Sequence, residues 1–255
     1  MKMQSIATDE SYFKMYEACL SRLNYDQVFT DTVSKMNTDV KFGFVKSCFA
    51  VGPSFGKYEI RFLKQCAPNL TKFLAIEPDH EAVELLRTAL KNSMPGVDSQ
   101  VTETDLENWE GLSDPVDLIL LFHVLYFVPA GERQELIKKI RDQWLAPGGS
   151  VAIVSASRTK SPGNLHMIYE RMGTPLLLWE DIESDLQKAG FTKHCAYEMR
   201  LEQDFANPDE MFLRFFQSYM KRPVTLDDIR DAIAELHPEG TAEGFNMFVI
   251  FTRRN

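Results

Sequence analysis

The sequence has few cysteines, and no two of them stand at CxxC spacing. Its five histidines are equally scattered and lack the close spacing of metal ligands. We therefore expect reduced thiols, as in cytoplasmic proteins, and no bound metal. The cysteines are Cys19, Cys48, Cys66 and Cys195.

Basic charge and long apolar runs are also scarce. The formal net charge is −9, whereas nucleic-acid binding requires a basic surface that displaces counterions. The most apolar stretch, 116–128, contains Asp117 and His123 and is too short to cross a bilayer. The first residues lack the apolar core of a signal peptide. We expect a cytoplasmic protein with neither nucleic acid nor membrane as a partner.

Short apolar runs and amphipathic segments alternate along the middle of the chain. The runs predict strands, and the segments between them place apolar residues at helical spacing. Strands that are apolar on both faces and alternate with helices are typical of a mostly parallel sheet covered on both sides. The predicted strands are 47–51, 73–76, 99–102, 118–122 and 150–155, and the predicted helices are 56–67, 78–93 and 130–145.

The last third of the chain has a different pattern. A predicted helix over 177–191 is stopped by Gly190 and is followed by predicted strands at 193–203 and 245–254. The chain between these strands, about 208–236, predicts a helical insertion. Since no helix separates the last strand from the chain end, we expect one of the final two strands to be antiparallel.

The stretch AVGPSFG joins the first predicted strand to the first predicted helix. Gly52 and Gly56 permit a tight turn and a close approach of a ligand to the backbone. Pro53 and Ser54 interrupt the pattern, which is neither GxGxxG nor a phosphate loop. An ordinary strand-to-helix turn is therefore an equal alternative for this motif alone.

Acidic residues follow the next two strands. Glu77, ahead of Pro78, ends the second strand, where an acid in an open α/β sheet accepts hydrogen bonds from ribose hydroxyls. A helix N-terminal acid stabilised by the dipole is the alternative. Thr104 and Asp105 follow the third strand, where polar side chains could contact an adenine edge. For Asp105, a cap of the next turn is the alternative. The loop and Glu77 together favour a nucleoside-bearing cofactor.

The fourth strand ends at Phe122 and His123, a position at which open α/β sheets bind ligands. A lone histidine is structural or functional about equally at this place. Tyr126 and Phe127 follow it and suit either a ligand pocket or the core.

The order of AVGPSFG, AIEP, TETD, VDLILLFHVLYFV and LAPGGSVAIV resembles the class I S-adenosylmethionine-dependent methyltransferases. This resemblance implies an α/β, Rossmann-like fold with a seven-stranded, mostly parallel sheet, an antiparallel last strand and helices on both faces. N-terminal helices and a helical insertion that covers the substrate complete it. Within the family the chain is most similar to the histamine N-methyltransferases, through SYFKMYEACLSRL near the N-terminus and the EP and ETD motifs.

The resemblance implies S-adenosyl-L-methionine as cofactor, S-adenosyl-L-homocysteine as product, and a single domain over 1–255. Its parts would be a helical cap at 1–42, a cofactor-binding half at 43–155 and a substrate-side half at 156–255. The residues expected at the cofactor are Gly52, Pro53, Ser54, Gly56, Glu77, Pro78, Thr104, Asp105, Phe122 and His123. Those expected at the substrate are Tyr12, Tyr16, Asp26, His123, Tyr126, Phe127, Tyr169, Phe215, Phe216 and Asn246.

The chain also departs from the family. Its loop has less glycine, and His123 stands where the histamine enzymes carry a glutamine. Their substrate-binding acid has no clear match among Asn24, Tyr25 and Asp26, of which Asp26 keeps the charge. These departures therefore count more against histamine as the acceptor than against methyl transfer in general.

The resulting hypothesis is methyl transfer to a small amine, histamine-like or other, by in-line displacement in a monomer. Such a reaction needs positioning and desolvation rather than a metal or a covalent nucleophile. His123 is the candidate base. Transfer to oxygen, a non-catalytic binding module that has lost its glycine loop, and a nicotinamide dehydrogenase are the alternatives. Apolar residues at helical spacing in 211–219 predict either a packed face or a lid over the substrate.

Overall fold

The computed structural model describes residues 12–40, 42–125, 128–158 and 165–253. Within these residues, seven strands form one sheet in the order β3-β2-β1-β4-β5-β7-β6. Strands β1 to β5 run parallel to one another, and β7 is antiparallel to both β5 and β6. This confirms the predicted α/β fold with an antiparallel last strand. The strands are β1 (Ser47–Val51), β2 (Lys72–Glu77), β3 (Asp98–Glu103), β4 (Val116–Phe122), β5 (Leu145–Ala156), β6 (Phe191–Asp204) and β7 (Thr241–Arg253).

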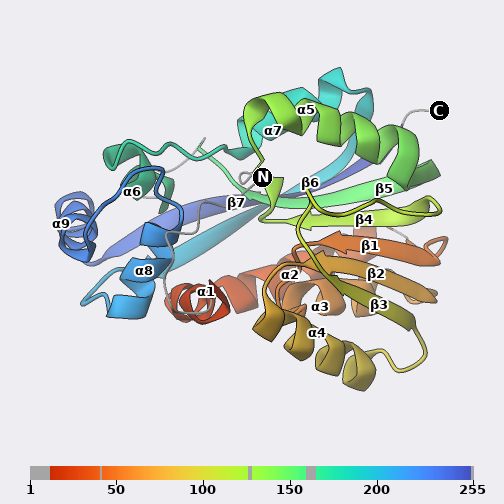
Figure 1. Ribbon diagram of the computed structural model, residues 1–255, viewed down its shortest axis with the longest axis horizontal. Coiled ribbons are helices and arrows are strands. Elements are labelled where there is room, and N and C mark those ends of the chain that lie inside the picture. The colour runs from red at the N-terminus through yellow and green to blue at the C-terminus, as the bar shows by residue number, and fades with distance from the viewer. Residues whose placement is uncertain (1–11, 41, 126–127, 159–164, 254–255) are drawn as a thin grey trace.

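The sheet lies between two layers of helices (Figure 1). Helices α2, α3 and α4 cover one face, and α5 and α7 cover the other. Helices α6, α8 and α9 gather at one end of the molecule, and α1 packs against α8. The helices are α1 (Tyr12–Leu20), α2 (Tyr25–Asp39), α3 (Lys57–Cys66), α4 (His80–Ser93), α5 (Ala130–Lys139), α6 (Leu165–Arg171), α7 (Trp179–Lys188), α8 (Glu210–Ser218) and α9 (Leu226–Leu236).

The position of each strand in the sheet explains its composition. Strands β1 and β4 lie in the middle and are buried along almost their whole length. Strand β3 lies at the edge, where only Val101 is buried. Central strands are covered on both faces, so they are read from the sequence as continuous apolar runs, whereas an edge strand is not.

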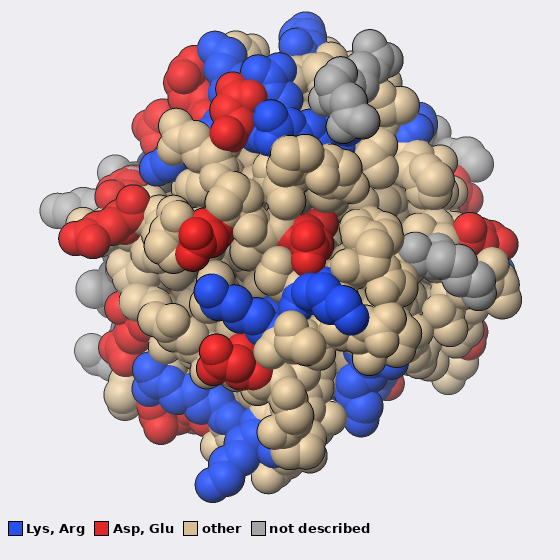
Figure 2. Space-filling view, turned by 90° about the vertical axis from the view of Figure 1, so that its right-hand side faces the viewer, with Lys and Arg blue, Asp and Glu red and all other residues tan. Residues whose placement is uncertain are grey.

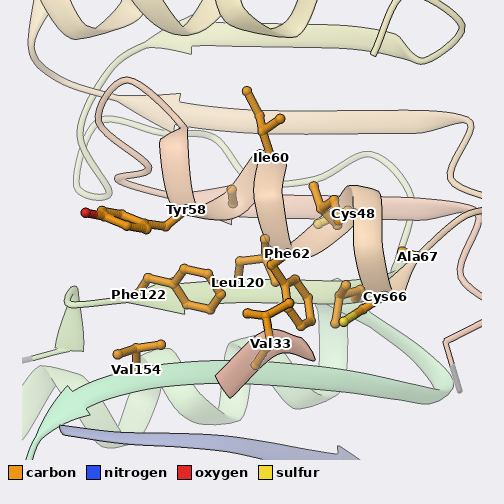
Figure 3. Close-up of a cluster of buried hydrophobic side chains, with 14 of the residues drawn as sticks. Val33, Cys48, Tyr58, Ile60, Phe62, Cys66, Ala67, Leu120, Phe122 and Val154 are labelled. Atoms are coloured by element: carbon orange, nitrogen blue, oxygen red, sulfur yellow. The ribbon is translucent and has the colours of Figure 1, made fainter. Parts of the chain in front are cut away.

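The two N-terminal helices occupy different places. Helix α1 lies at the end of the molecule with α8, whereas α2 packs into the main core on the sheet (Figure 1). Phe29 of α2 is fully buried, and its ring lies 5.8 Å from that of Phe122 and 5.6 Å from that of Phe248. Val33 of the same helix and Phe62 of α3 belong to the same cluster (Figure 3).

The helix predicted over 130–145 ends earlier than expected. Helix α5 stops at Lys139, a π-helical turn follows at Ile140–Trp144, and β5 begins at Leu145, which pairs with Val116. The π turn buries Trp144, whose ring lies 5.0 Å from that of Trp109. Pro147, Gly148 and Gly149 belong to β5, where the register with β4 shifts.

Strands β6 and β7 extend beyond the rest of the sheet. The end of β5, Ala156, pairs with Asn246, but the β6–β7 ladder continues to the pair Asp204–Thr241. The expected insertion connects the ends of this ladder as α8 and α9, which share an apolar cluster with α1 and α6. The insertion thereby comes to lie next to α1.

Two surface properties of the described residues bear on partners. No helix in this part of the chain combines the length and the apolar character needed to cross a membrane. On the face seen in Figure 2, acidic and basic side chains are interspersed.

Candidate functional site

A cavity of about 860 Å³ opens at the carboxyl ends of β1, β2 and β4. Its lining includes Gly52 after β1, Pro78 after β2 and His123 after β4, together with Tyr12 and Tyr16 of α1. The strand order reverses between β1 and β4, and parallel α/β sheets bind their ligands at such a switch point. This cavity is the candidate functional site.

The two glycines of the loop after β1 differ in their tasks. Gly52 has a φ of +58°, lines the cavity, and donates its N–H to the carbonyl oxygen of Ile76 at 2.8 Å. Gly56 has a φ of +76° and is the N-cap residue of α3; a Cβ there would lie 2.3 Å from Cδ1 of Leu86. Gly56 is not part of the cavity lining, whereas Pro53 and Ser54 are. Gly56 therefore shapes the loop, and Gly52 opens the floor of the cavity.

Glu77 joins two of the loops around the cavity. The residue is 6% exposed, and its carboxylate accepts hydrogen bonds from the backbone N–H of Ser54 at 2.8 Å and of Asp79 at 3.0 Å. Burial raises the pKa of Glu77 to about 7, because the charged form loses hydration. The cavity floor thus carries a carboxyl at the end of β2, where the sequence predicts one.

Thr104 and Asp105 also line the cavity. Asp105 accepts hydrogen bonds from the backbone N–H of Glu107 at 3.0 Å and of Asn108 at 2.9 Å, and from the Asn108 side chain. These contacts are those of a turn cap, the alternative that the sequence leaves open for this residue. Asp105 can cap the turn and border the cavity at once.

His123 lies in a wall shared by two cavities. Its backbone has a φ of +57°, and its N–H donates to the carbonyl oxygen of Val154 at 2.8 Å. Nε2 of the ring lies 2.9 Å from the hydroxyl oxygen of Tyr25. Burial lowers the pKa of His123 to about 4, so the imidazole is neutral at pH 7. Phe122 precedes it and lines the large cavity.

The second cavity is small, about 90 Å³, and shares Tyr16, Tyr25 and His123 with the first. The described residues that line it include no Asp, Glu, Lys or Arg. Burial lowers the pKa of His166 and raises that of the Cys19 thiol, so both are neutral near pH 7. Polar contacts come from His166, Gln203 and Asn246, which are 2%, 5% and 7% exposed. The pocket is therefore mostly apolar, with a few polar groups that carry no charge.

The residues that the sequence assigns to the substrate are only partly brought together. Tyr12 lines the large cavity, Tyr16 and His123 line both, and Tyr169, Phe215 and Asn246 line the small one. Phe216 lines neither, because it is fully buried in the helical cluster with Tyr169 and Phe212. Tyr126 and Phe127 lie outside the described residues.

Asp26 is also outside both cavities. Its carboxylate lies 2.7 Å from Nζ of Lys57 and 3.1 Å from Nη1 of Arg61, and its side chain is half exposed. Its neighbour Tyr25 faces the cavities instead, because consecutive residues of a helix point about 100° apart. Of the three residues weighed for this position, Tyr25 is the one that reaches the site.

Three further lining residues escape the sequence pattern. Glu59, His166 and Gln203 are buried polar residues of α3, α6 and β6. Glu59 carries a weak signal, since an acid among the apolar positions of an amphipathic helix is unusual. For His166 and Gln203 we find no signal in the sequence.

Most of the chain resembles solved structures at low sequence identity. One of them is a candidate methyltransferase of Bacillus halodurans, 12% identical over 88% of this chain and 100% of its own, with a TM-score of 0.65. Another is the N-methyltransferase NodS of Bradyrhizobium japonicum, solved with S-adenosyl-L-homocysteine, 13% identical over 91% of this chain and 89% of its own, with a TM-score of 0.56. The chain has the class I methyltransferase fold.

These likenesses concern the fold. No family model matches the sequence, and no curated protein matches it. The cyclase SpnF has a similar fold, with 16% identity over 88% of this chain and 79% of its own and a TM-score of 0.54. Because a cyclase shares the fold, the reaction must be argued from the site.

Proposed function

We propose that the protein is an S-adenosylmethionine-dependent N-methyltransferase that acts on a small amine. The observation that carries this proposal is the pair of adjacent cavities with a common wall of Tyr16, Tyr25 and His123. One is large enough for a nucleoside-bearing cofactor, and the other is small and mostly apolar, with a few uncharged polar groups. Ligands that fill the two cavities would approach each other at these shared residues, as a direct transfer requires.

The residues of the large cavity fit the cofactor. Glu77 would hold the ribose hydroxyls, and Gly52 leaves room for close approach to the backbone. Thr104 and Asp105 border the place expected for the adenine edge, and Trp144 adds an aromatic surface to the lining. When bound, this cofactor supplies an activated methyl group on a sulfonium.

His123 would position the acceptor rather than deprotonate it. With a pKa of about 4, its imidazole is too weak a base to take a proton from an ammonium at neutral pH. It remains a hydrogen-bonding group whose ring is oriented by Tyr25. The acceptor would therefore bind as a neutral amine or imidazole and lose its proton to water after the transfer.

The uncharged small cavity supports this order of events. An ammonium ion without a counter-ion is costly to bury, whereas a neutral amine needs only hydrogen bonds. Gln203 and Asn246 can provide them. Nitrogen is favoured over oxygen as the acceptor because no described charged residue lines this cavity to ionise a hydroxyl.

The proposal extends to the organisation of the chain. Residues 1–255 would act as a single domain and a monomer, with 43–155 supplying the cofactor site and 156–255 most of the acceptor site. The N-terminal helices contribute Tyr12, Tyr16 and Tyr25 to the cavities.

Calorimetric titration with S-adenosyl-L-homocysteine tests the cofactor. We expect micromolar or tighter binding that Glu77→Ala abolishes and Glu77→Gln weakens, with thermal unfolding reported for each variant. A mass-spectrometric screen of amines, phenols and carboxylic acids with S-adenosylmethionine then tests the acceptor. Absence of binding at millimolar ligand would reject the enzyme and favour a non-catalytic module.

The role of His123 is tested by pH–rate profiles of His123→Gln and His123→Ala. A positioning role predicts that glutamine retains more activity than alanine and that both profiles keep the wild-type shape. If a titration between about pH 4 and 7 disappears from both profiles, His123 acts as a base instead.

A further inference from the structure

Glu59 is a buried acid in the wall of the large cavity. It lies in the first turn of α3 and is 5% exposed. Among the described residues, the only hydrogen-bonding group at its carboxyl is its own backbone N–H. A carboxyl so deeply buried is normally paired with a cation, so its partner is to be sought in the ligand.

The cationic residues that flank Glu59 in α3 are engaged elsewhere. Nζ of Lys57 lies 2.7 Å and Nη1 of Arg61 lies 3.1 Å from Oδ1 of Asp26 on α2. In the described part of the chain, no ion pair involves Glu59. Burial, with a smaller contribution from Glu77, raises the pKa of Glu59 to about 8. The carboxyl is therefore mainly protonated at pH 7 in the ligand-free protein.

The neighbours of Glu59 indicate which part of a ligand it meets. It interacts electrostatically with Glu77 at the end of β2, with Tyr25 at the wall shared with the small cavity, and with the adjacent Tyr58 and Cys48. Glu77 would hold the ribose of the cofactor, and the reacting sulfur would have to face the shared wall. Glu59 on α3 and the loop before α3 would then be the residues available to the amino-acid part.

We propose that Glu59 binds the α-ammonium group of the cofactor's amino-acid part through a charge-assisted hydrogen bond. This assignment rests on the proposed function. On binding, the proton of the Glu59 carboxyl passes to solvent, and the resulting carboxylate pairs with the ammonium, which keeps its own protons. Glu59 thus supplies the charge that selects the amino-acid part, and Glu77 selects the ribose.

Two ligands that differ only in the ammonium group isolate this contact. One is S-adenosyl-L-homocysteine, and the other is its deaminated analogue, in which hydrogen replaces the ammonium. Calorimetry on wild type and Glu59→Gln is expected to show that the variant binds S-adenosyl-L-homocysteine about ten- to a hundredfold more weakly. Its affinity for the analogue should stay within about twofold of the wild-type value. Glu77→Gln is the matched control and should weaken both ligands alike, since both carry the ribose.

Proton release gives a second readout. At pH 7, titrations in buffers of different ionisation enthalpy should show that S-adenosyl-L-homocysteine releases up to about one proton more than the analogue in wild type. Glu59→Gln should remove this difference. The variant lacks a titrating group at this position but keeps its shape, and circular dichroism and thermal unfolding verify that it folds.

The possible failures are distinguishable. If wild type binds neither ligand, the proposed function is rejected together with this assignment. If wild type binds both and Glu59→Gln weakens both equally or neither, only the assignment to Glu59 is rejected. A rise in the KM of the amine acceptor without a change for S-adenosyl-L-homocysteine would assign Glu59 to the acceptor and overturn the proposal.

Discussion

The hydroxyl oxygen of Tyr25 lies 2.9 Å from Nε2 of His123, across a sequence separation of 98 residues. Tyr25 begins α2, and His123 follows β4 in a left-handed backbone conformation. The contact joins an N-terminal helix to the end of a central strand at the wall between the two cavities. It gives the imidazole a fixed orientation in a place where burial keeps it neutral.

Removal of the Tyr25 hydroxyl should impair turnover without affecting cofactor binding. In Tyr25→Phe the imidazole loses one hydrogen bond, worth about 0.5–1.5 kcal/mol, so we expect kcat to fall by up to about tenfold. The affinity for S-adenosyl-L-homocysteine should change by less than about twofold. Tyr197→Phe is the control, because its hydroxyl donates to Asp39 at 2.8 Å, outside the lining of both cavities. Equal losses of kcat in the two variants would contradict the positioning role.

Gly56 should be among the least replaceable residues of the loop. An alanine there would need a φ of +76° and would set its Cβ 2.3 Å from Cδ1 of Leu86. We expect Gly56→Ala to lower the free energy of unfolding by about 2–4 kcal/mol, from backbone strain and overpacking together. Gly96→Ala is the control, because no heavy atom lies within 4 Å of a Cβ at that position. Denaturant titration measures both, and Leu86→Ala should recover part of the loss if the side-chain contact matters.

Much of the fold follows from burial on both faces of the central strands. The predicted strand at 47–51 coincides with β1, because an uninterrupted apolar run fits a central strand that is buried on both faces of the sheet. The limits of β5 do not follow, since the π turn depends on how Trp144 packs against Trp109 and Phe49. Local periodicity carries no information on such a tertiary requirement.

The two cavities also differ in how far the sequence predicts them. Several residues of the large cavity lie at or just after strand ends, so the predicted order of strands is enough to bring Gly52, Glu77 and His123 together. The small cavity is assembled from α1, α2, α6, α8, β5, β6, β7 and several connecting segments, and its polar residues on α6 and β6 resemble ordinary core or surface positions in the sequence. A difference of one residue along α2 separates Tyr25, which faces the cavities, from Asp26, which faces Lys57.

Gln203 should contribute to acceptor binding at the expense of stability. Its Oε1 is buried without a hydrogen-bond partner among the described residues, and its side chain lines the small cavity. Gln203→Met keeps the volume and removes the unpaired amide, so we expect the free energy of unfolding to stay constant or rise by up to about 1 kcal/mol. The KM for the amine should rise about tenfold. In Gln217→Met, which removes a hydrogen bond of 2.7 Å to the Val224 carbonyl, stability should instead fall by about 1 kcal/mol.

Two buried carboxyls in the wall of the large cavity predict how stability changes with pH. Burial raises the pKa of Glu59 to about 8 and that of Glu77 to about 7, so above pH 5 these two carboxyls hold more protons in the folded protein than in the unfolded chain. The stabilisation that these two groups contribute is fully present below their pKa in the unfolded chain, and it is lost as the pH rises through their pKa in the folded protein. Buried His123 acts in the opposite direction, but only below about pH 6.5, where the unfolded side chain gains a proton. Between pH 6.5 and 8, denaturant titrations of the ligand-free protein should therefore show a loss of about 1–3 kcal/mol. Glu59→Gln should reduce that loss, whereas Glu239→Gln, at an exposed position, should leave it unchanged. If the free energy of unfolding changed with pH by the same slope in wild type and both variants, Glu59 would be ionised in the folded protein.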